Sequence, residues 1–168
     1  SKDLDAGKLD LPDKLPRDAA EKRGWDVLLT TCFGALDKTE QDILVRWVHN
    51  ALEIRGDVRP YLELLHRNSQ GLPKLDRYVG KLLTKQANLA NPVFGAAFAA
   101  YVEWCSMNRT AVSGRVMIGM VSARFRVDRQ RGRQLNTLAL FRVPLPDYKI
   151  STVRGFVSRV KHILVGIR

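Results

Sequence analysis

Apolar residues recur at intervals of three and four along most of this 168-residue chain, which is the spacing of one face of an α-helix. The stripe is clearest near the end of the chain, where it runs from Ile150 to Ile167. The spacing predicts helices at residues 18–35, 38–55, 60–65, 73–83, 92–105, 110–127, 134–141 and 150–167. We therefore predict an all-α fold of about eight to nine helices.

Residues that favour helix starts precede several of these stretches. Asp37 and Glu40 have the spacing of a capping box, in which each side chain satisfies a backbone N–H at the start of a helix. Proline is tolerated at the first position of a helix, because the N–H that it lacks would have no partner there. Three of the predicted helices have a proline at that position, namely Pro60, Pro73 and Pro92. We expect a helix to begin at each of these points.

The middle of the chain contains its most apolar segment. Residues 93–105 are almost all apolar or alanine, so we expect them to form the buried central helix. Residues 110–127 mix β-branched residues with Gly114 and Gly119, and a pair of strands is an alternative there. The apolar residues of this segment recur at threes and fours, and it contains no Asn-Gly or Asp-Gly turn, which favours a helix.

Length and composition are those of a globular protein with one domain or two small bundles. We divide the chain into a flexible or loosely docked arm at residues 1–17, a helical subdomain at 18–90 and a basic helical subdomain at 91–168. The arm has no apolar run, so we expect no secretory signal, and no stretch approaches the roughly 18 apolar residues of a membrane span. Cys32 and Cys105 each stand alone in an apolar stretch, which favours free thiols in a reducing compartment.

Charge is distributed unevenly along the chain. Residues 1–108 carry 15 Lys and Arg against 15 Asp and Glu, whereas residues 109–168 carry 13 against 2, which accounts for the whole net charge of +11. Arginine dominates the basic part, and its planar guanidinium suits phosphate oxygens of RNA or of phospholipid. The asymmetry indicates an anionic surface as partner, and a solvated face remains the ordinary alternative for a run of charge.

The densest basic stretch lies at residues 124–133, and few aromatic residues interleave it. Because stacking platforms and base-reading motifs are lacking, we expect binding to follow backbone charge rather than sequence. The candidate lipid- or RNA-binding residues are Arg109, Arg115, Arg124, Arg126, Arg129, Arg131, Arg133, Arg154, Arg159 and Lys161.

Enzyme motifs are scarce in this sequence. His49, His66 and His162 lie far apart without a second ligand at metal spacing. The chain has no nucleophile elbow, dinucleotide fingerprint, Walker A loop or zinc-protease motif. We therefore predict no catalytic residue, no metal and no cofactor; an enzyme would need a cleft that gathers His49 or His66 with carboxylates.

Two segments resemble the orthomyxovirus matrix protein family in their order and helical context. Residues 47–57, WVHNALEIRGD, resemble the end of a helix in that family's amino-terminal half, and residues 108–123, NRTAVSGRVMIGMVSA, resemble the buried helix of its middle subdomain. Between them, residues 75–86 resemble the family's basic helix and residues 94–104 its small-residue helix. The resemblance covers residues 25–134.

The resemblance implies two packed helical bundles and a structural protein without catalysis. Such a protein forms a homo-oligomeric lattice beneath the envelope of the virion and bridges anionic membrane lipid and the viral ribonucleoprotein. It would occur in the virion and, in the infected host cell, in the cytoplasm, in the nucleus and at the inner membrane leaflet. A sequence-nonspecific RNA-binding or nucleocapsid-type protein without a membrane role is the alternative function.

The chain departs from the family's pattern in its basic and metal-binding motifs. The matching basic helix holds only Arg77, Lys81 and Lys85, so we treat it as a secondary site. Ser122 and Phe125 stand where some members have a zinc-like motif of Cys and His, so we predict no zinc.

The two ends of the chain also differ from the family. The region before Trp25 is shorter than in the influenza-type proteins, and residues 150–167 have no clear counterpart. We therefore expect a divergent genus, or a fragment that lacks a carboxy-terminal domain.

Overall fold

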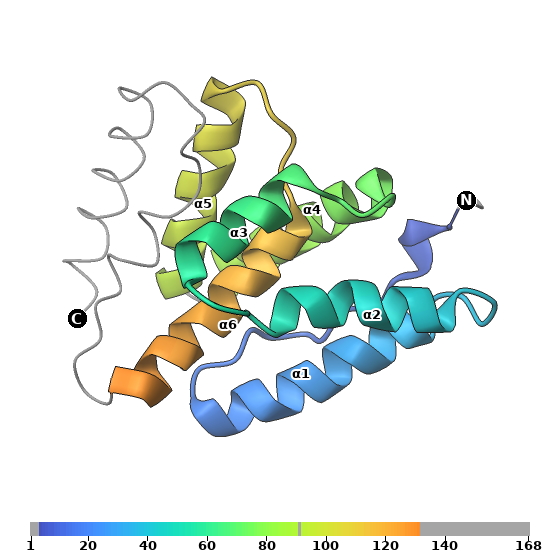
Figure 1. Ribbon diagram of the computed structural model, residues 1–168, viewed down its shortest axis with the longest axis horizontal. Coiled ribbons are helices and arrows are strands. Elements are labelled where there is room, and N and C mark those ends of the chain that lie inside the picture. Colours follow the sequence, from blue (N-terminus) through green and yellow to red (C-terminus); the bar gives the residue numbers. More distant parts are fainter. Residues whose placement is uncertain (1–3, 91, 132–168) are drawn as a thin grey trace.

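A computed structural model describes residues 4–90 and 92–131 (Figure 1). These residues form helices and no strands, which confirms the all-α class for the described part of the chain. Eight to nine helices overstates the six α-helices found there, and the helices expected at 134–141 and 150–167 lie outside the described residues. The elements are η1 (Ala6–Lys8), α1 (Ala19–Gly34), α2 (Gln41–Leu52), α3 (Val58–Arg67), α4 (Pro73–Ala90), α5 (Pro92–Met107) and α6 (Gly114–Arg131).

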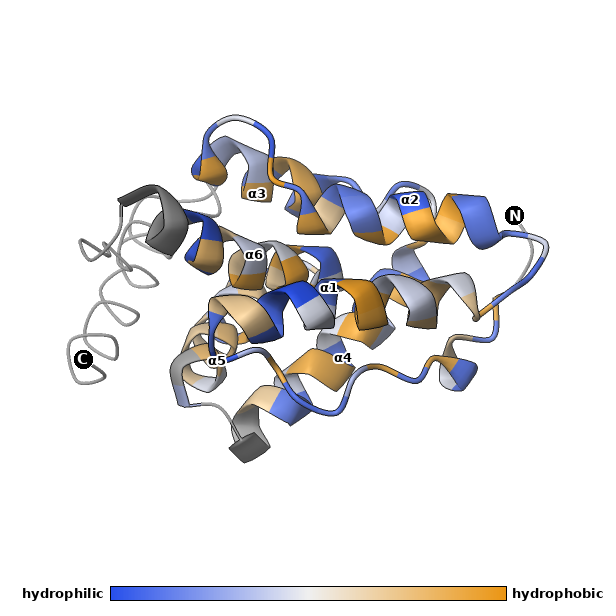
Figure 2. Ribbon diagram, turned by 90° about the horizontal axis from the view of Figure 1, so that it is seen from below, coloured by the Kyte–Doolittle hydropathy of each residue, from blue (hydrophilic) through white to orange (hydrophobic). Residues whose placement is uncertain are grey.

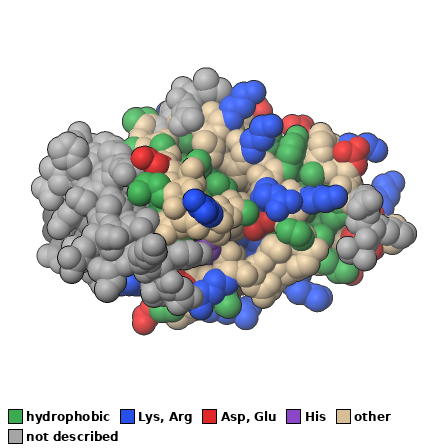
Figure 3. All heavy atoms as spheres, turned by 90° about the horizontal axis from the view of Figure 1, so that it is seen from above, with side chains coloured by type: hydrophobic (Ala, Val, Ile, Leu, Met, Phe, Trp, Pro, Cys, Tyr) green, Lys and Arg blue, Asp and Glu red, His purple; other side chains and the backbone are tan. Residues whose placement is uncertain are grey.

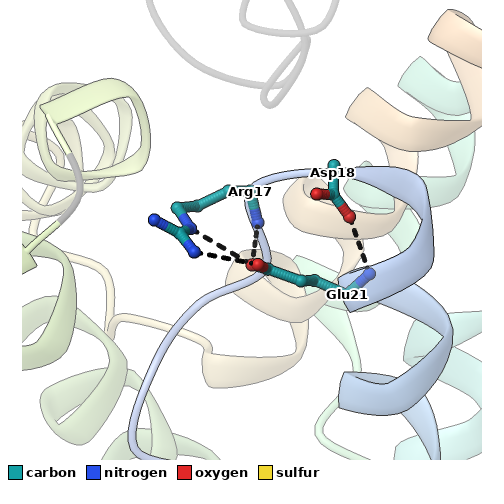
Figure 4. Close-up of polar contacts among 3 residues, drawn as sticks. All are labelled: Arg17, Asp18 and Glu21. Carbon is teal, nitrogen blue, oxygen red and sulfur yellow. Dashed lines mark hydrogen bonds and ion pairs between the residues drawn. The ribbon is translucent and has the colours of Figure 1, made fainter.

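The start of α1 has the reciprocal hydrogen bonds of a capped helix. Asp18 accepts a hydrogen bond from the backbone N–H of Glu21 at 2.8 Å, and the Glu21 carboxylate accepts one from the backbone N–H of Arg17 at 3.0 Å (Figure 4). The Arg17 guanidinium also donates to that carboxylate, at 3.0 Å. The bond to Asp18 satisfies a donor that the first helical turn leaves without a partner, and the bonds from Arg17 attach the preceding chain to that turn.

Two of the predicted helix starts are displaced. Asp37 accepts from the N–H groups of Thr39 and Glu40, at 2.8 and 3.3 Å, so it closes a turn, and α2 begins only at Gln41. Helix α3 begins at Val58, two residues before Pro60. By contrast, α4 and α5 begin at Pro73 and Pro92, as the prolines predict.

Helix α6, rather than α5, is the central helix. It packs against α2, α3 and α4 and touches α1, and every residue from 113 to 123 is buried. Seen from below, α6 lies between α3 and α4 (Figure 2). The prediction that 93–105 form the central helix is therefore wrong: α5 packs on α4 and leaves Ala99 and Glu103 exposed.

Close approach at two glycines allows α6 to occupy this position. A Cβ at Gly114 would lie 2.6 Å from Cβ of Val79 and 2.7 Å from the backbone nitrogen of Gly80, both on α4. At Gly119 a Cβ would lie 2.5 Å from Cδ2 of Leu62 on α3. Real Cβ atoms do not approach other atoms this closely, so a larger residue at Gly114 would push α6 away from the backbone of α4, whereas one at Gly119 would displace the leucine side chains of α3.

The segment before α1 is docked on the helices, which agrees with the docked alternative for residues 4–17 rather than the flexible one. Leu9, Leu11 and Leu15 are buried in the hydrophobic core. The side-chain amide of Gln86 on α4 donates to the carbonyl of Pro12 at 2.7 Å, and η1 also packs against α4. Charged residues between the leucines stay exposed. Because charged and apolar residues alternate here, the apolar face of the segment is not evident from the sequence.

One hydrophobic core joins the described residues on both sides of the boundary predicted at residue 90. Its members run from Leu9 in the first segment to Ala123 in α6. Of the two free thiols, Cys105 is buried within this core and Cys32 packs against it. Burial raises the pKa of the Cys105 thiol to about 12, so this group is a packing residue rather than a reactive thiolate. The prediction of free thiols is confirmed.

Substituting Gly114→Ala should destabilise the protein by roughly 1–3 kcal/mol, since the added methyl group overlaps the backbone of α4. Gly24→Ala is the matched control: Gly24 lies inside α1 with no atom within 4 Å of an added Cβ, so alanine should stabilise by roughly 0.5–1 kcal/mol. Urea unfolding of the two variants measures both effects. Equal effects of the two substitutions would contradict the close contact between α4 and α6.

Candidate functional site

A buried carboxylate, Asp76 on α4, holds the amino-terminal end of α6. Only 5% of Asp76 is exposed, and its Oδ1 accepts hydrogen bonds from the Ser113 hydroxyl at 3.1 Å and from the backbone N–H of Arg115 at 2.9 Å. Burial raises the pKa of Asp76, and these hydrogen bonds oppose the rise. The carboxylate thus satisfies free donors at the positive end of the α6 dipole.

Arg115 is buried beside this carboxylate, so its assignment to an exposed basic face is wrong. Its exposed fraction is 2%, its Nη1 donates to the carbonyl of Asn68 at 2.7 Å, and its guanidinium carbon lies 5.4 Å from the ring centroid of Trp47. Trp47 in turn donates to the carbonyl of Ser69 at 2.8 Å. Arg115 therefore connects α6 to α2 and to the loop that follows α3.

A half-buried histidine, His66, completes this polar network. Nδ1 of His66 lies 2.6 Å from the Tyr101 hydroxyl, and Nε2 lies 3.2 Å from the hydroxyl of Thr110. The Tyr101 hydroxyl accepts from the backbone N–H of Ser113 at 3.2 Å, so its own proton is available for Nδ1. This arrangement fits a neutral imidazole, and burial, with a smaller effect of Arg67, lowers the pKa of His66 to about 4.

The depressed pKa of His66 predicts a loss of stability in acid. Between pH 6.5 and about 4 the unfolded chain binds a proton at His66 that the folded chain does not, so the free energy of unfolding falls as pH falls. At pH 5 the loss should be roughly 2 kcal/mol relative to pH 7. Urea unfolding of the wild type and of His66→Gln across this range isolates the contribution, since other titrating groups are common to both.

His49→Gln serves as the control for this experiment, because the pair that His49 forms with Glu53 is exposed and such a pair contributes little to stability. The variant should keep most of the wild-type loss of stability in acid. A His66→Gln profile as steep as that of the wild type would overturn the assignment.

The remaining predicted arginines do not gather into one described cluster. Arg109 is exposed just after α5, whereas Arg124 is half-buried. Nη1 of Arg126 donates to the carbonyls of Ile54 and Gly56, at 3.3 and 2.7 Å, and so fixes the loop between α2 and α3. Arg129 and Arg131 belong to the end of α6, where only the backbone is described, and Arg133, Arg154, Arg159 and Lys161 lie outside the described residues.

A row of exposed cations follows the outer side of α4. The predicted residues Arg77, Lys81 and Lys85 are joined by Lys74, which lies one turn earlier and which sequence reasoning missed. Their spacing of three, four and four residues places them on one helical face, over roughly 16 Å of helix. We call these four residues the α4 ridge.

The α4 ridge has no neutralising partner within the described part of the chain. The opposite face of α4 buries Leu75, Val79 and Leu83, and the only carboxylate of the helix, Asp76, is buried with them. None of the ion pairs among the described residues involves the ridge. Its Lys74 could have been found from the sequence, because it precedes Arg77 by three residues on the same helical face.

Opposite charges lie close together on α1 and α3. Both helices carry ion pairs between successive turns, as in Lys22 with Asp26 and Arg59 with Glu63. In the view from above, Lys and Arg side chains also lie among acidic and hydrophobic ones over the described part of that face (Figure 3). Such alternation is typical of an ordinary solvated surface.

A cleft of about 1300 Å³ between α1, α2 and α6 brings His49 together with carboxylates, as an enzyme would require. Nε2 of His49 lies 2.7 Å from Glu53, one turn away on the same helix, and both side chains are more than half exposed. The nearby Ser122 is buried, and its hydroxyl forms no hydrogen bond to another described residue. Histidine and serine are therefore not connected as a nucleophile and its base.

Among the described residues, no group of three His, Cys, Asp or Glu side chains is arranged to hold a metal ion. None of the helices in this part of the chain combines the length and the apolar character needed to cross a bilayer. Comparison with family models, curated proteins and solved structures found no match to this chain.

Proposed function

We propose that this chain is a matrix-type structural protein that binds an anionic membrane surface through the α4 ridge and bridges that surface to the viral ribonucleoprotein. The α4 ridge is the observation that carries the proposal: four exposed cations lie on one face of a helix whose single acidic residue is buried. The excess of basic residues after position 108 and the resemblance to orthomyxovirus matrix proteins support the same function.

The strength of such a contact implies many copies. Each Lys or Arg near an anionic membrane contributes about 1 kcal/mol, so the α4 ridge contributes roughly 4 kcal/mol, which corresponds to a dissociation constant near 1 mM. One molecule would bind too weakly to coat a membrane. A lattice of copies beneath the envelope would bind tightly, because linked contacts multiply the affinity.

The α4 ridge takes the leading role that the sequence assigned to residues 124–133. Of that stretch, Arg126 is engaged with backbone carbonyls and Arg124 is half-buried. Arg129, Arg131 and Arg133 remain predicted contributors to the same anionic contact. The proposal therefore treats the end of α6 as a second basic site beside the ridge.

Vesicle flotation at physiological salt tests the ridge directly. The triple variant Arg77→Gln, Lys81→Gln and Lys85→Gln should bind phosphatidylserine vesicles roughly a hundredfold more weakly than the wild type, since about 3 kcal/mol of attraction is lost. The matched control neutralises three exposed cations on α1, the following turn and α2, namely Arg23, Lys38 and Arg46. It lowers the net charge equally and should lose far less affinity.

Two results would contradict the proposal. One is equal recovery of the wild type on neutral and on phosphatidylserine vesicles, and the other is equal weakening by the ridge variant and its control. Adding single-stranded RNA to vesicle-bound protein distinguishes the two functions. Release of the protein from the vesicles, without a complex of protein, RNA and vesicle, favours an RNA-binding protein without a membrane role. Binding to both together favours the bridging function.

A further inference from the structure

A small cavity lies between the end of α2, the loop after it, α3 and the loop that precedes α4. Its volume is about 270 Å³, which is smaller than the usual pocket for a drug-sized molecule. Its polar lining comes from Asn50, Arg55, Tyr61, Asn68, Gln70 and Arg115, and no carboxylate is among the described residues that line it. The cavity therefore brings two arginines and three side-chain amides to one pocket that is open to solvent on one side.

Arg115 brings unused hydrogen-bond donors to this cavity. Its Nη1 donates to Asn68, but its buried Nε has no acceptor among the described residues. No carboxylate in that part of the chain forms an ion pair with the guanidinium, since Asp76 accepts from the backbone N–H of Arg115 instead. Asp76 and the Trp47 ring favour the charged form of Arg115, but neither accepts a hydrogen bond from its guanidinium. An anion in the cavity would give this buried charge a direct partner.

Arg55 supplies the second positive charge at the mouth of the cavity. It is exposed, unlike Arg115, and it lines the same space. The charges of both arginines reach Tyr61, where they oppose the rise in its pKa that burial causes. One arginine at the base and one at the opening would hold an anion between them.

The amide groups of the cavity are held in place before any ligand binds. Asn68 accepts a hydrogen bond from the backbone N–H of Gln70 at 2.8 Å, and the side chain of Asn50 donates to that of Gln70 at 3.4 Å. The Tyr61 hydroxyl donates to the carbonyl of Asn50. These contacts connect α2, α3 and the loop after α3, so ligand binding would require little rearrangement.

The geometry points to a binding site for a phosphate group in this cavity, held by the free donors of Arg115 and by the guanidinium of Arg55. A phosphate oxyanion matches two guanidinium groups and neighbouring amides, because it offers several acceptor oxygens in different directions. The phosphate could belong to a soluble phosphate compound or to a lipid headgroup. The site uses none of the α4 ridge and does not depend on the proposed function.

Titration with inorganic phosphate in a phosphate-free buffer, followed by amide chemical shifts, tests the site. Saturable shifts are expected at the backbone of Gln70 and at the side-chain amide of Asn50. Arg55→Gln should weaken the binding about tenfold, since a charged hydrogen-bond donor is lost. Arg23→Gln, which removes an exposed arginine of α1 outside the cavity, should bind phosphate like the wild type.

The test uses no Arg115 variant, because the loss of this buried side chain would destabilise the fold itself. Absence of saturable shifts, or equal weakening by Arg55→Gln and Arg23→Gln, would overturn the site. Displacement of bound phosphate by phosphatidic acid vesicles, but not by neutral vesicles, would assign it to a lipid headgroup. Retained phosphate binding in the presence of these vesicles would assign it to a soluble phosphate compound. A ridge variant that loses vesicle binding but keeps these shifts would separate the two sites.

Discussion

The structure depends on burying residues 114–123 of α6 among four other helices. A buried helix start leaves backbone N–H groups without water, and here the Asp76 carboxylate and the Ser113 hydroxyl accept hydrogen bonds from them. Close packing also requires that α6 lack side chains where it meets α4 and α3, which Gly114 and Gly119 provide. The buried position of α6 therefore requires both hydrogen-bond acceptors at its first turn and small residues along its length.

Arg115 extends the same constraint to the rest of the fold. Its guanidinium packs on Trp47 of α2 and donates to Asn68 after α3, so the start of α6 determines where two other helices lie. His66 and Tyr101 connect this point to α3 and α5 through hydrogen bonds. A polar network at the centre of an apolar core specifies one arrangement of helices, because any other arrangement would leave these groups unsatisfied.

Helical periodicity was sufficient to predict the class of the fold and the positions of the six described helices, but not which helix is central. Residues 93–105 are the more apolar segment, whereas α6 contains an arginine and two glycines in its buried part. Average hydropathy cannot show that the arginine is held by Trp47 and Asn68, or that the glycines permit contact. Both facts arise from partners far away in the sequence.

The same long-range contacts explain why the charge asymmetry of the sequence does not match the described surface. In the basic half, Arg115 is buried against the Trp47 ring and donates to a backbone carbonyl, and Arg126 donates to two backbone carbonyls, so neither belongs to an exposed basic face. In the balanced half, α4 buries its one carboxylate at the start of α6 and leaves Lys74, Arg77, Lys81 and Lys85 in solvent. Burial of Asp76 therefore both completes the core and makes the outer face of α4 purely cationic, so a single carboxylate links the stability of the fold to its proposed anionic partner.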